Sequence, residues 1–268
     1  MKSNTSVDWL TNLGRFFFAI AMVFFGIQHF IYAIPVAGPV AGPPWILGRP
    51  LWAYFVGAFF LAVSVSIATK FKTGLAASLL GTMLFLYVLI LYVPGLLAHP
   101  HDPGSWTSVS ELLAMSGAAF VLAGSLTVAP PPFRRWHNAA DKLIPLGRLL
   151  FAIPLVVFGL QHFMFARFVA TLVPSWIPRR LFWAYFVGGA FIAASVSIAS
   201  KVKGPLAATL LGTMFFLWVI FLHAPRVAAA PHNGKEWTSA FVALAMCGGA
   251  LIVARTLPGG PADRQAYL

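Results

Sequence analysis

Long apolar runs fill most of this chain, and short polar or proline-rich stretches separate them. A run of about 18–20 apolar residues is long enough to cross a bilayer core as an α-helix. No ten-residue alternating pattern typical of a membrane β-barrel is present, and open sheet edges cannot be satisfied in lipid. The pattern therefore predicts an all-α polytopic membrane protein with eight transmembrane helices. They are expected over residues 14–33, 51–69, 74–97, 108–128, 146–166, 182–200, 204–224 and 238–256.

The same four-run pattern is written twice. "GRFFFAIAMVFFGIQHFIYA" (14–33) matches "GRLLFAIPLVVFGLQHFMFA" (147–166), and "WAYFVG", "SVSIA", "LLGTM" and "WTS" then recur in the same order. Internal repeats of this kind indicate duplicated structural units. We therefore expect two four-helix units, 1–130 and 145–268, joined by a cytoplasmic linker at 131–144. Because each unit has an even number of spans, both take the same orientation, which makes the repeat parallel and not inverted.

Composition and charge agree with a membrane protein. Hydrophobic residues make up 60% of the 268, and the mean hydropathy is +0.85, whereas soluble domains are about 45–50% apolar. The net charge of +12 comes from Lys and Arg scattered at the ends of apolar runs, without a basic stripe or a nucleic-acid-binding motif. Twelve of the 18 Lys and Arg residues fall on the side that holds both termini, so both termini are expected in the cytoplasm.

The single cysteine limits the chemistry. Cys247 alone cannot form an intramolecular disulfide, a CxxC redox pair or a thiolate metal site. No motif for a metal site is present either, and none is predicted. Any redox chemistry would have to use groups other than protein thiols.

Two polar pairs interrupt the apolar runs at matching positions, Gln28–His29 and Gln161–His162. Polar side chains at such depth are costly unless they face a partner or the interior of the helix bundle. One interpretation is interhelical hydrogen bonding. Another is a site for a small redox or lipid-like ligand. Haem ligation is disfavoured, because each half offers a single mid-span histidine of this kind.

The repeat is broken at two polar positions. Glu111 stands where the second half has Val242, and His223 stands where the first half has Tyr92. Because Glu111 is expected at a depth similar to that of His29, the two are candidate acid–base partners. The alternative for Glu111 is a carboxylate at the start of a helix, following the cap-like "TSVSE".

Further candidates lie in the loops opposite the termini. His101 aligns with His232, Trp106 with Trp237, and Trp45 with Trp176. All six, together with Gln28, Gln161 and His162, are candidate ligand-binding residues. For the tryptophans the alternative is the interfacial aromatic belt, and for the histidines it is a solvated loop.

These motifs resemble those of the DoxX family of membrane proteins. "VPSWIP" (173–178) followed by "FWAYFVGG" (182–189) is similar to the family pattern, from which "GPPWILG" (42–48) departs. Two such units cover nearly the whole chain, so it looks like a tandem DoxX-like protein. The resemblance implies a bacterial cytoplasmic (inner) membrane protein, similar to the small membrane subunit of thiosulfate:quinone oxidoreductase. Distant eukaryotic relatives act as membrane chaperones or cargo receptors, and no catalytic residue set carries over.

Two functional hypotheses follow. In the first, the protein is a membrane redox accessory protein that binds a quinone-like or other amphiphilic ligand. That ligand would lie near the outer leaflet, between His29 and Glu111 and around Trp45, with a second site at His162 and Trp176. In the second, it is a non-catalytic scaffold subunit whose partners are other membrane or redox-complex subunits besides the lipid bilayer. A transporter is disfavoured by the parallel repeat.

Overall fold

The structure is a computed structural model of the chain, and it describes residues 5–32, 49–126 and 134–257. Every regular element in these ranges is a helix. The α-helices are α1 (Thr5–Tyr32), α2 (Arg49–Thr69), α3 (Thr73–Tyr87), α4 (Val93–Ala98), α5 (Pro103–Leu126), α6 (Arg134–Met164), α7 (Ala166–Leu172), α8 (Arg180–Ser200), α9 (Gly204–Trp218), α10 (Ala224–Ala229) and α11 (Gly234–Arg255). Two π-helical segments, η1 (Val88–Tyr92) and η2 (Val219–His223), join α3 to α4 and α9 to α10.

Eight of these helical stretches within the described residues are long and apolar enough to cross a membrane. They cover Trp9–Tyr32, Pro50–Thr69, Thr73–Ala98, Pro103–Ser125, Lys142–Met164, Arg180–Ser200, Gly204–Ala229 and Gly234–Arg255. The prediction of an all-α polytopic membrane protein with eight spans is confirmed, with boundaries that differ by a few residues. The linker expected at 131–144 is in large part helical, because α6 already begins at Arg134.

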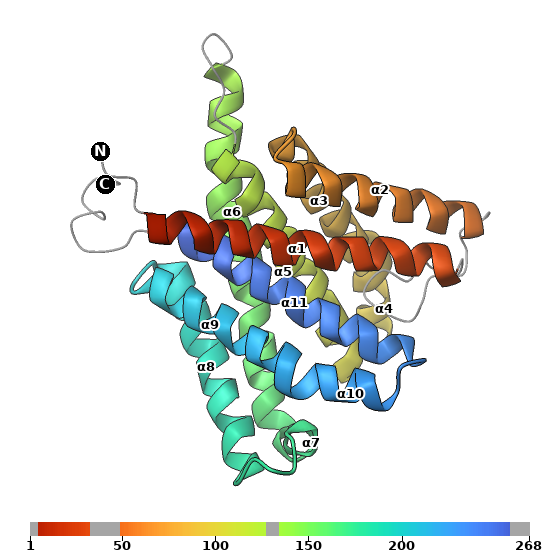
Figure 1. Cartoon of the computed structure of the whole chain (residues 1–268). Helices are drawn as coiled ribbons and strands as arrows, with labels where there is room; N and C mark the ends of the chain where they lie inside the picture. The colour runs from red at the N-terminus through yellow and green to blue at the C-terminus, as the bar shows by residue number, and fades with distance from the viewer. Residues whose placement is uncertain (1–4, 33–48, 127–133, 258–268) are drawn as a thin grey trace.

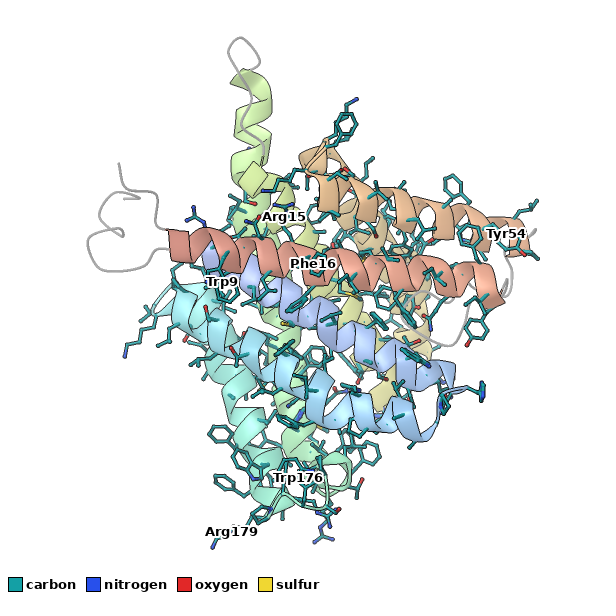
Figure 2. The ribbon with its side chains drawn as sticks, viewed as in Figure 1. Trp9, Arg15, Phe16, Tyr54, Trp176 and Arg179 are labelled. Atoms are coloured by element: carbon teal, nitrogen blue, oxygen red, sulfur yellow. The ribbon has the colours of Figure 1, made fainter. Side chains whose placement is uncertain are left out.

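Exposed aromatic side chains lie towards both ends of the spans. Figure 2 shows Trp9 near the start of α1, Tyr54 near the start of α2, and Trp176 at the tip of the molecule beside the start of α8. The exposed fractions of these three side chains are 55%, 40% and 68%. Phe16, which is 56% exposed, projects outward from the middle of this surface. Such a surface suits a lipid environment with aromatic belts at its borders.

The eight spans form a closed ring in which two opposite helices also contact each other across the middle. Each span packs against its neighbours in the chain, and α11 closes the ring on α1 (Figure 1). In addition, α5 and α11, the last spans of the two halves, contact each other across the middle. Accordingly, 67% of each of these two spans is buried, whereas no other span exceeds 44%. The two central helices are therefore shared by both lobes of the molecule.

The two sequence halves interlock through the first and last spans of each half. The first span of one half packs on the last span of the other, α1 on α11 and α6 on α5. Glycines make these crossings close: a Cβ atom on Gly14 would lie 2.9 Å from the carbonyl oxygen of Gly248, and one on Gly117 would lie 2.5 Å from that of Gly147. Backbone contact at small residues is the usual basis of tight helix association in membranes.

The π-helical segments occur at equivalent places in the third span of each half. A proline follows each segment, Pro94 after η1 and Pro225 after η2. Proline has no N–H to donate, so the α-helical ladder cannot continue unchanged through it. The amides of Val93 and Ala224 bond to carbonyls five residues back, those of Val88 and Val219. This extra residue per turn sets the direction of the side chains of η2, including His223.

Candidate functional site

A large cleft of about 1600 Å³ lies in the lobe formed by the second half. Its walls come from α6 to α10 with η2, from the segment after α7, and from both central helices, α5 and α11. Along α8 its lining runs from Trp183 to Ser197, which is about 21 Å at the helical rise. At the Ser197 end, Ala194, Leu210 and Leu211 make the walls apolar. The cleft is thus a long trough, and both halves of the chain contribute residues to its lining.

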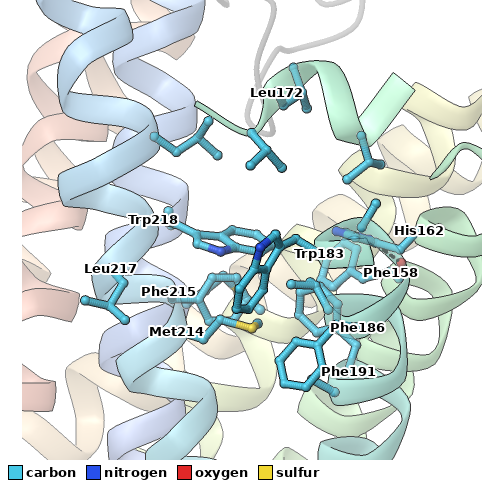
Figure 3. A pocket seen from close by; sticks show the side chains of 18 of the residues that line it. Phe158, His162, Leu172, Trp183, Phe186, Phe191, Met214, Phe215, Leu217 and Trp218 are labelled. Carbon is cyan, nitrogen blue, oxygen red and sulfur yellow. Dashed lines mark hydrogen bonds between the residues drawn. The ribbon is translucent and has the colours of Figure 1, made fainter. Parts of the chain in front are cut away.

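Aromatic rings surround the half-buried side chain of His162 at the other end of this trough. The imidazole stacks on Trp218 with ring centroids 6.1 Å apart, and it meets Phe191 edge-on at 5.2 Å. Phe215 contacts both of these residues, and Phe158 contacts Phe191. Figure 3 shows the rings of Trp183 and Trp218 beside His162 in the cleft. Such a cage favours a flat ligand that can stack on indole and phenyl faces.

The hydrogen bond of His162 to its own helix determines the tautomer of the imidazole, and therefore leaves Nε2 as an acceptor. Its Nδ1 atom lies 2.8 Å from the backbone oxygen of Phe158, one turn back on α6 (dashed in Figure 3). A carbonyl oxygen only accepts, so Nδ1 carries the proton that it donates there. In this apolar cage a charged imidazolium is costly. The neutral ring therefore presents the lone pair of Nε2.

Glu111 lies on the wall of the same cleft, although it belongs to the first half of the chain. It is expected to work with His29, but His29 is not among the residues that line the cleft. The ring of His29 lies in the first-half lobe, 5.7 Å from that of Phe60, and its Nδ1 atom lies 2.7 Å from the oxygen of Phe25. The interlocked helices thus bring Glu111 to the cleft of His162.

The helix-start interpretation of Glu111 does not fit the observed start of α5. The helix begins at Pro103, which places Glu111 about 12 Å along it, in the third turn, whereas the favourable effect of the helix dipole is confined to the first turn. That role falls to Asp102, whose carboxylate accepts hydrogen bonds from the amide and hydroxyl of Ser105 at 2.7 and 2.6 Å. These bonds lower the pKa of Asp102.

His223 is a buried histidine of the cleft, with a ring nitrogen that is unpaired within the described parts of the chain. Its side chain is only 9% exposed, it lines the cleft, and its Nδ1 atom has no hydrogen-bond partner among the described residues. A buried polar atom left unpaired costs about 1–3 kcal/mol. The sequence shows His223 as a break in the repeat, but only the structure places it in the cleft. Its unpaired nitrogen indicates a place where a ligand atom would be stabilised.

An ion pair lies near His223. The guanidinium of Arg226 meets the carboxylate of Glu236 through two contacts, Nε to Oε2 at 2.9 Å and Nη2 to Oε1 at 3.0 Å. The pair links α10 to the start of α11, and His223 is within electrostatic reach of both charges. Sequence reasoning missed this pair. The signal was available, since Gly95 and Ser105 occupy the equivalent positions in the first half.

The two glutamines fasten the halves together. Gln28 donates to the hydroxyl of Thr238 at 2.9 Å, and Gln161 accepts from the hydroxyl of Thr107 at 3.1 Å. Gln161 also donates to the backbone oxygen of Pro103 at 2.8 Å. In both cases a glutamine of one half holds the start of the last span of the other half. These are the interhelical hydrogen bonds expected as one interpretation, and Gln161 lines the cleft as well.

The remaining candidate residues divide between loops and the cleft. His101 and His232 are exposed in the turns before α5 and α11. Trp106 and Trp237 are each partly exposed and donate through Nε1 to Pro100 and Pro231, both at 2.9 Å. Trp176 lines the cleft mouth and packs edge-on against Phe221 at 5.9 Å. Trp45 lies outside the described residues.

No group of three or more His, Cys, Asp or Glu side chains is placed to hold a metal ion within the described parts of the chain. Comparisons with known protein families, with curated proteins and with solved structures find no match to this chain.

Proposed function

We propose that the protein binds an amphiphilic, quinone-like molecule in the cleft between α8 and α9, as an accessory of a membrane redox system. The observation that carries this proposal is the polarity of the cleft along its length. One end is an apolar trough, whereas the rest of the lining includes Glu111, His162, His223 and Arg226, with aromatic rings around His162. A ligand with an apolar tail and a flat polar head matches both ends.

The dimensions support the same ligand class. From Phe191, which contacts His162, to Ser197 the apolar part of the trough extends about 9 Å along α8, which suits a short isoprenoid or alkyl chain lying along the helices. At the polar end, the indoles of Trp183 and Trp218 would stack on a ring, and the titratable side chains of the lining would meet its oxygen atoms. The redox context, the DoxX-like ancestry, the inner-membrane location and the cytoplasmic termini are proposed from the sequence motifs and the distribution of Lys and Arg.

Binding of a short-chain benzoquinone to the purified protein tests the proposal, with quenching of tryptophan fluorescence as the measurement. We expect saturable quenching, because three tryptophans, Trp176, Trp183 and Trp218, line the cleft. Replacement Ala190→Phe would fill the trough and abolish the saturable component. Its neighbour Gly189 is exposed and faces open space, so Gly189→Phe is the matched control and should bind normally. Quenching that never saturates, or that A190F leaves unchanged, would contradict the proposal.

A scaffold role is the second candidate, and the hydrogen bonds of Gln28 and Gln161 favour it. Both side chains are used to join helices, as a purely structural role requires. Under this alternative, partner subunits recovered from native membranes would be the same with the wild type and with A190F, and neither protein would bind quinone. Loss of quinone binding in A190F alone would favour the ligand-binding role.

A further inference from the structure

The imidazole of His162 supplies a hydrogen-bond acceptor to the polar end of the cleft. His162 donates through Nδ1 to its own helix, so the nitrogen left for a ligand, Nε2, accepts. Glu111, on the same wall, accepts through its carboxyl oxygens and also donates when it carries a proton, so it can meet either form of a ligand. Gln161, the neighbour of His162 in the chain, uses its oxygen and one of its two N–H groups on α5. A ligand atom next to Nε2 of His162 is therefore better matched if it donates than if it only accepts.

His223 adds a second requirement. Its buried Nδ1 atom has no partner within the described residues, and it would act as a donor in one tautomer and as an acceptor in the other. A hydroxyl group can donate and accept, so it satisfies this atom in either tautomer. A carbonyl oxygen satisfies it in one tautomer only.

We propose that the cleft selects the reduced, hydroxyl-bearing form of its ligand over the oxidised, carbonyl-bearing form. The head would be a hydroquinone whose hydroxyl donates to Nε2 of His162, with further polar contacts to Glu111 and His223. This proposal rests on the proposed function, and it adds which redox form binds and why. It follows from the direction of one hydrogen bond, because the backbone of α6 holds the proton of the imidazole on the side away from the cleft.

The test compares three ligands with the same ring and tail: a decyl hydroquinone, its dimethyl ether and the corresponding quinone. Binding to the full-length protein in detergent is followed by tryptophan fluorescence under argon, which keeps the hydroquinone reduced. Partition into empty micelles is measured separately for each ligand. We expect the hydroquinone to bind about ten-fold more tightly than the quinone, since one buried acceptor would otherwise stay unpaired. The ether, which cannot donate, should bind like the quinone.

Variants of His162 assign the preference to its side chain. In His162→Phe the acceptor is lost, so hydroquinone affinity should fall to that of the quinone while quinone affinity is unchanged. His162→Gln keeps an acceptor and should retain part of the preference. The matched control is His29→Gln, at the equivalent position of the first-half lobe, which should leave all three affinities unchanged.

The outcomes separate this proposal from the proposed function. Equal binding of hydroquinone and quinone, or tighter binding of the quinone, overturns the preference and leaves quinone-like binding standing. A preference that persists in H162F overturns the assigned residue and with it the proposal. Saturable binding of none of the three ligands overturns both proposals.

Discussion

Glutamine and histidine stand side by side in the repeated segment "QHF", yet each has a different task. Gln28 and Gln161 reach across to the last span of the opposite half, whereas His29 and His162 bond to the backbone of their own helices. Adjacent residues on an α-helix point about 100° apart, so a single dipeptide serves two faces. One face fastens the halves, and the other presents an imidazole to aromatic neighbours.

A double-mutant cycle on Gln28 and Thr238 tests the fastening role. Gln28→Ala and Thr238→Val should each destabilise the fold, and the double variant should cost less than the sum of the two. The expected coupling is about 0.6 kcal/mol, the average for hydrogen bonds between membrane helices. Reversible unfolding of the purified protein in mixed micelles gives the free energies. Additive effects of the two replacements would show that the bond contributes nothing.

At the scale of elements, the crossings of first and last spans depend on glycine. Gly14 meets Gly248 and Gly117 meets Gly147, and in both pairs the opposing atoms are backbone, which cannot rotate away. The glycine of the "GR" that opens each repeat can be recognised in the sequence, but the sequence does not show which glycine of another helix it contacts. Which helix a glycine faces depends on how distant spans pack, and helical periodicity contains no information on that.

Substitution at one crossing should separate packing from helix propensity. In Gly117→Ala, the added Cβ would lie 2.5 Å from the oxygen of Gly147 and 2.6 Å from the amide nitrogen of Phe151, so α5 and α6 must move apart. We expect a loss of several kcal/mol in unfolding free energy, the scale of severe overpacking. Gly189→Ala, in open space on α8, should instead be neutral or stabilise the helix. Thermal unfolding of the two variants checks both expectations, and similar stabilities would contradict the packing argument.

For the whole molecule, the central position of α5 and α11 makes each lobe depend on both halves of the sequence. The cleft itself takes Glu111 from the first half and His162 and His223 from the second. The first spans are likewise exchanged, with α1 on α11 and α6 on α5. Two sequence repeats therefore do not correspond to two independent structural units.

Dividing the chain between residues 130 and 131 tests this dependence. Each fragment lacks the helix against which its first and last spans pack, so neither should be stable as a monomer. Co-expressed fragments should copurify in a 1:1 ratio, with the protease resistance of the intact protein. Size-exclusion chromatography with light scattering gives the stoichiometry. A monodisperse, protease-resistant monomer of either fragment alone would contradict the interlocked arrangement.

Sequence alone determined the helical class, the eight spans and the duplication, because these depend on local features: the length of apolar runs, their spacing and the order of repeated motifs. It also singled out the histidines, Glu111 and the breaks in the repeat as unusual. Only the tertiary structure decided which of them meet. Glu111 lines the cleft of His162 because the last span of each half packs against the first span of the other. The choice of helix neighbours is a property of long-range contacts, and no local pattern in an apolar run encodes it.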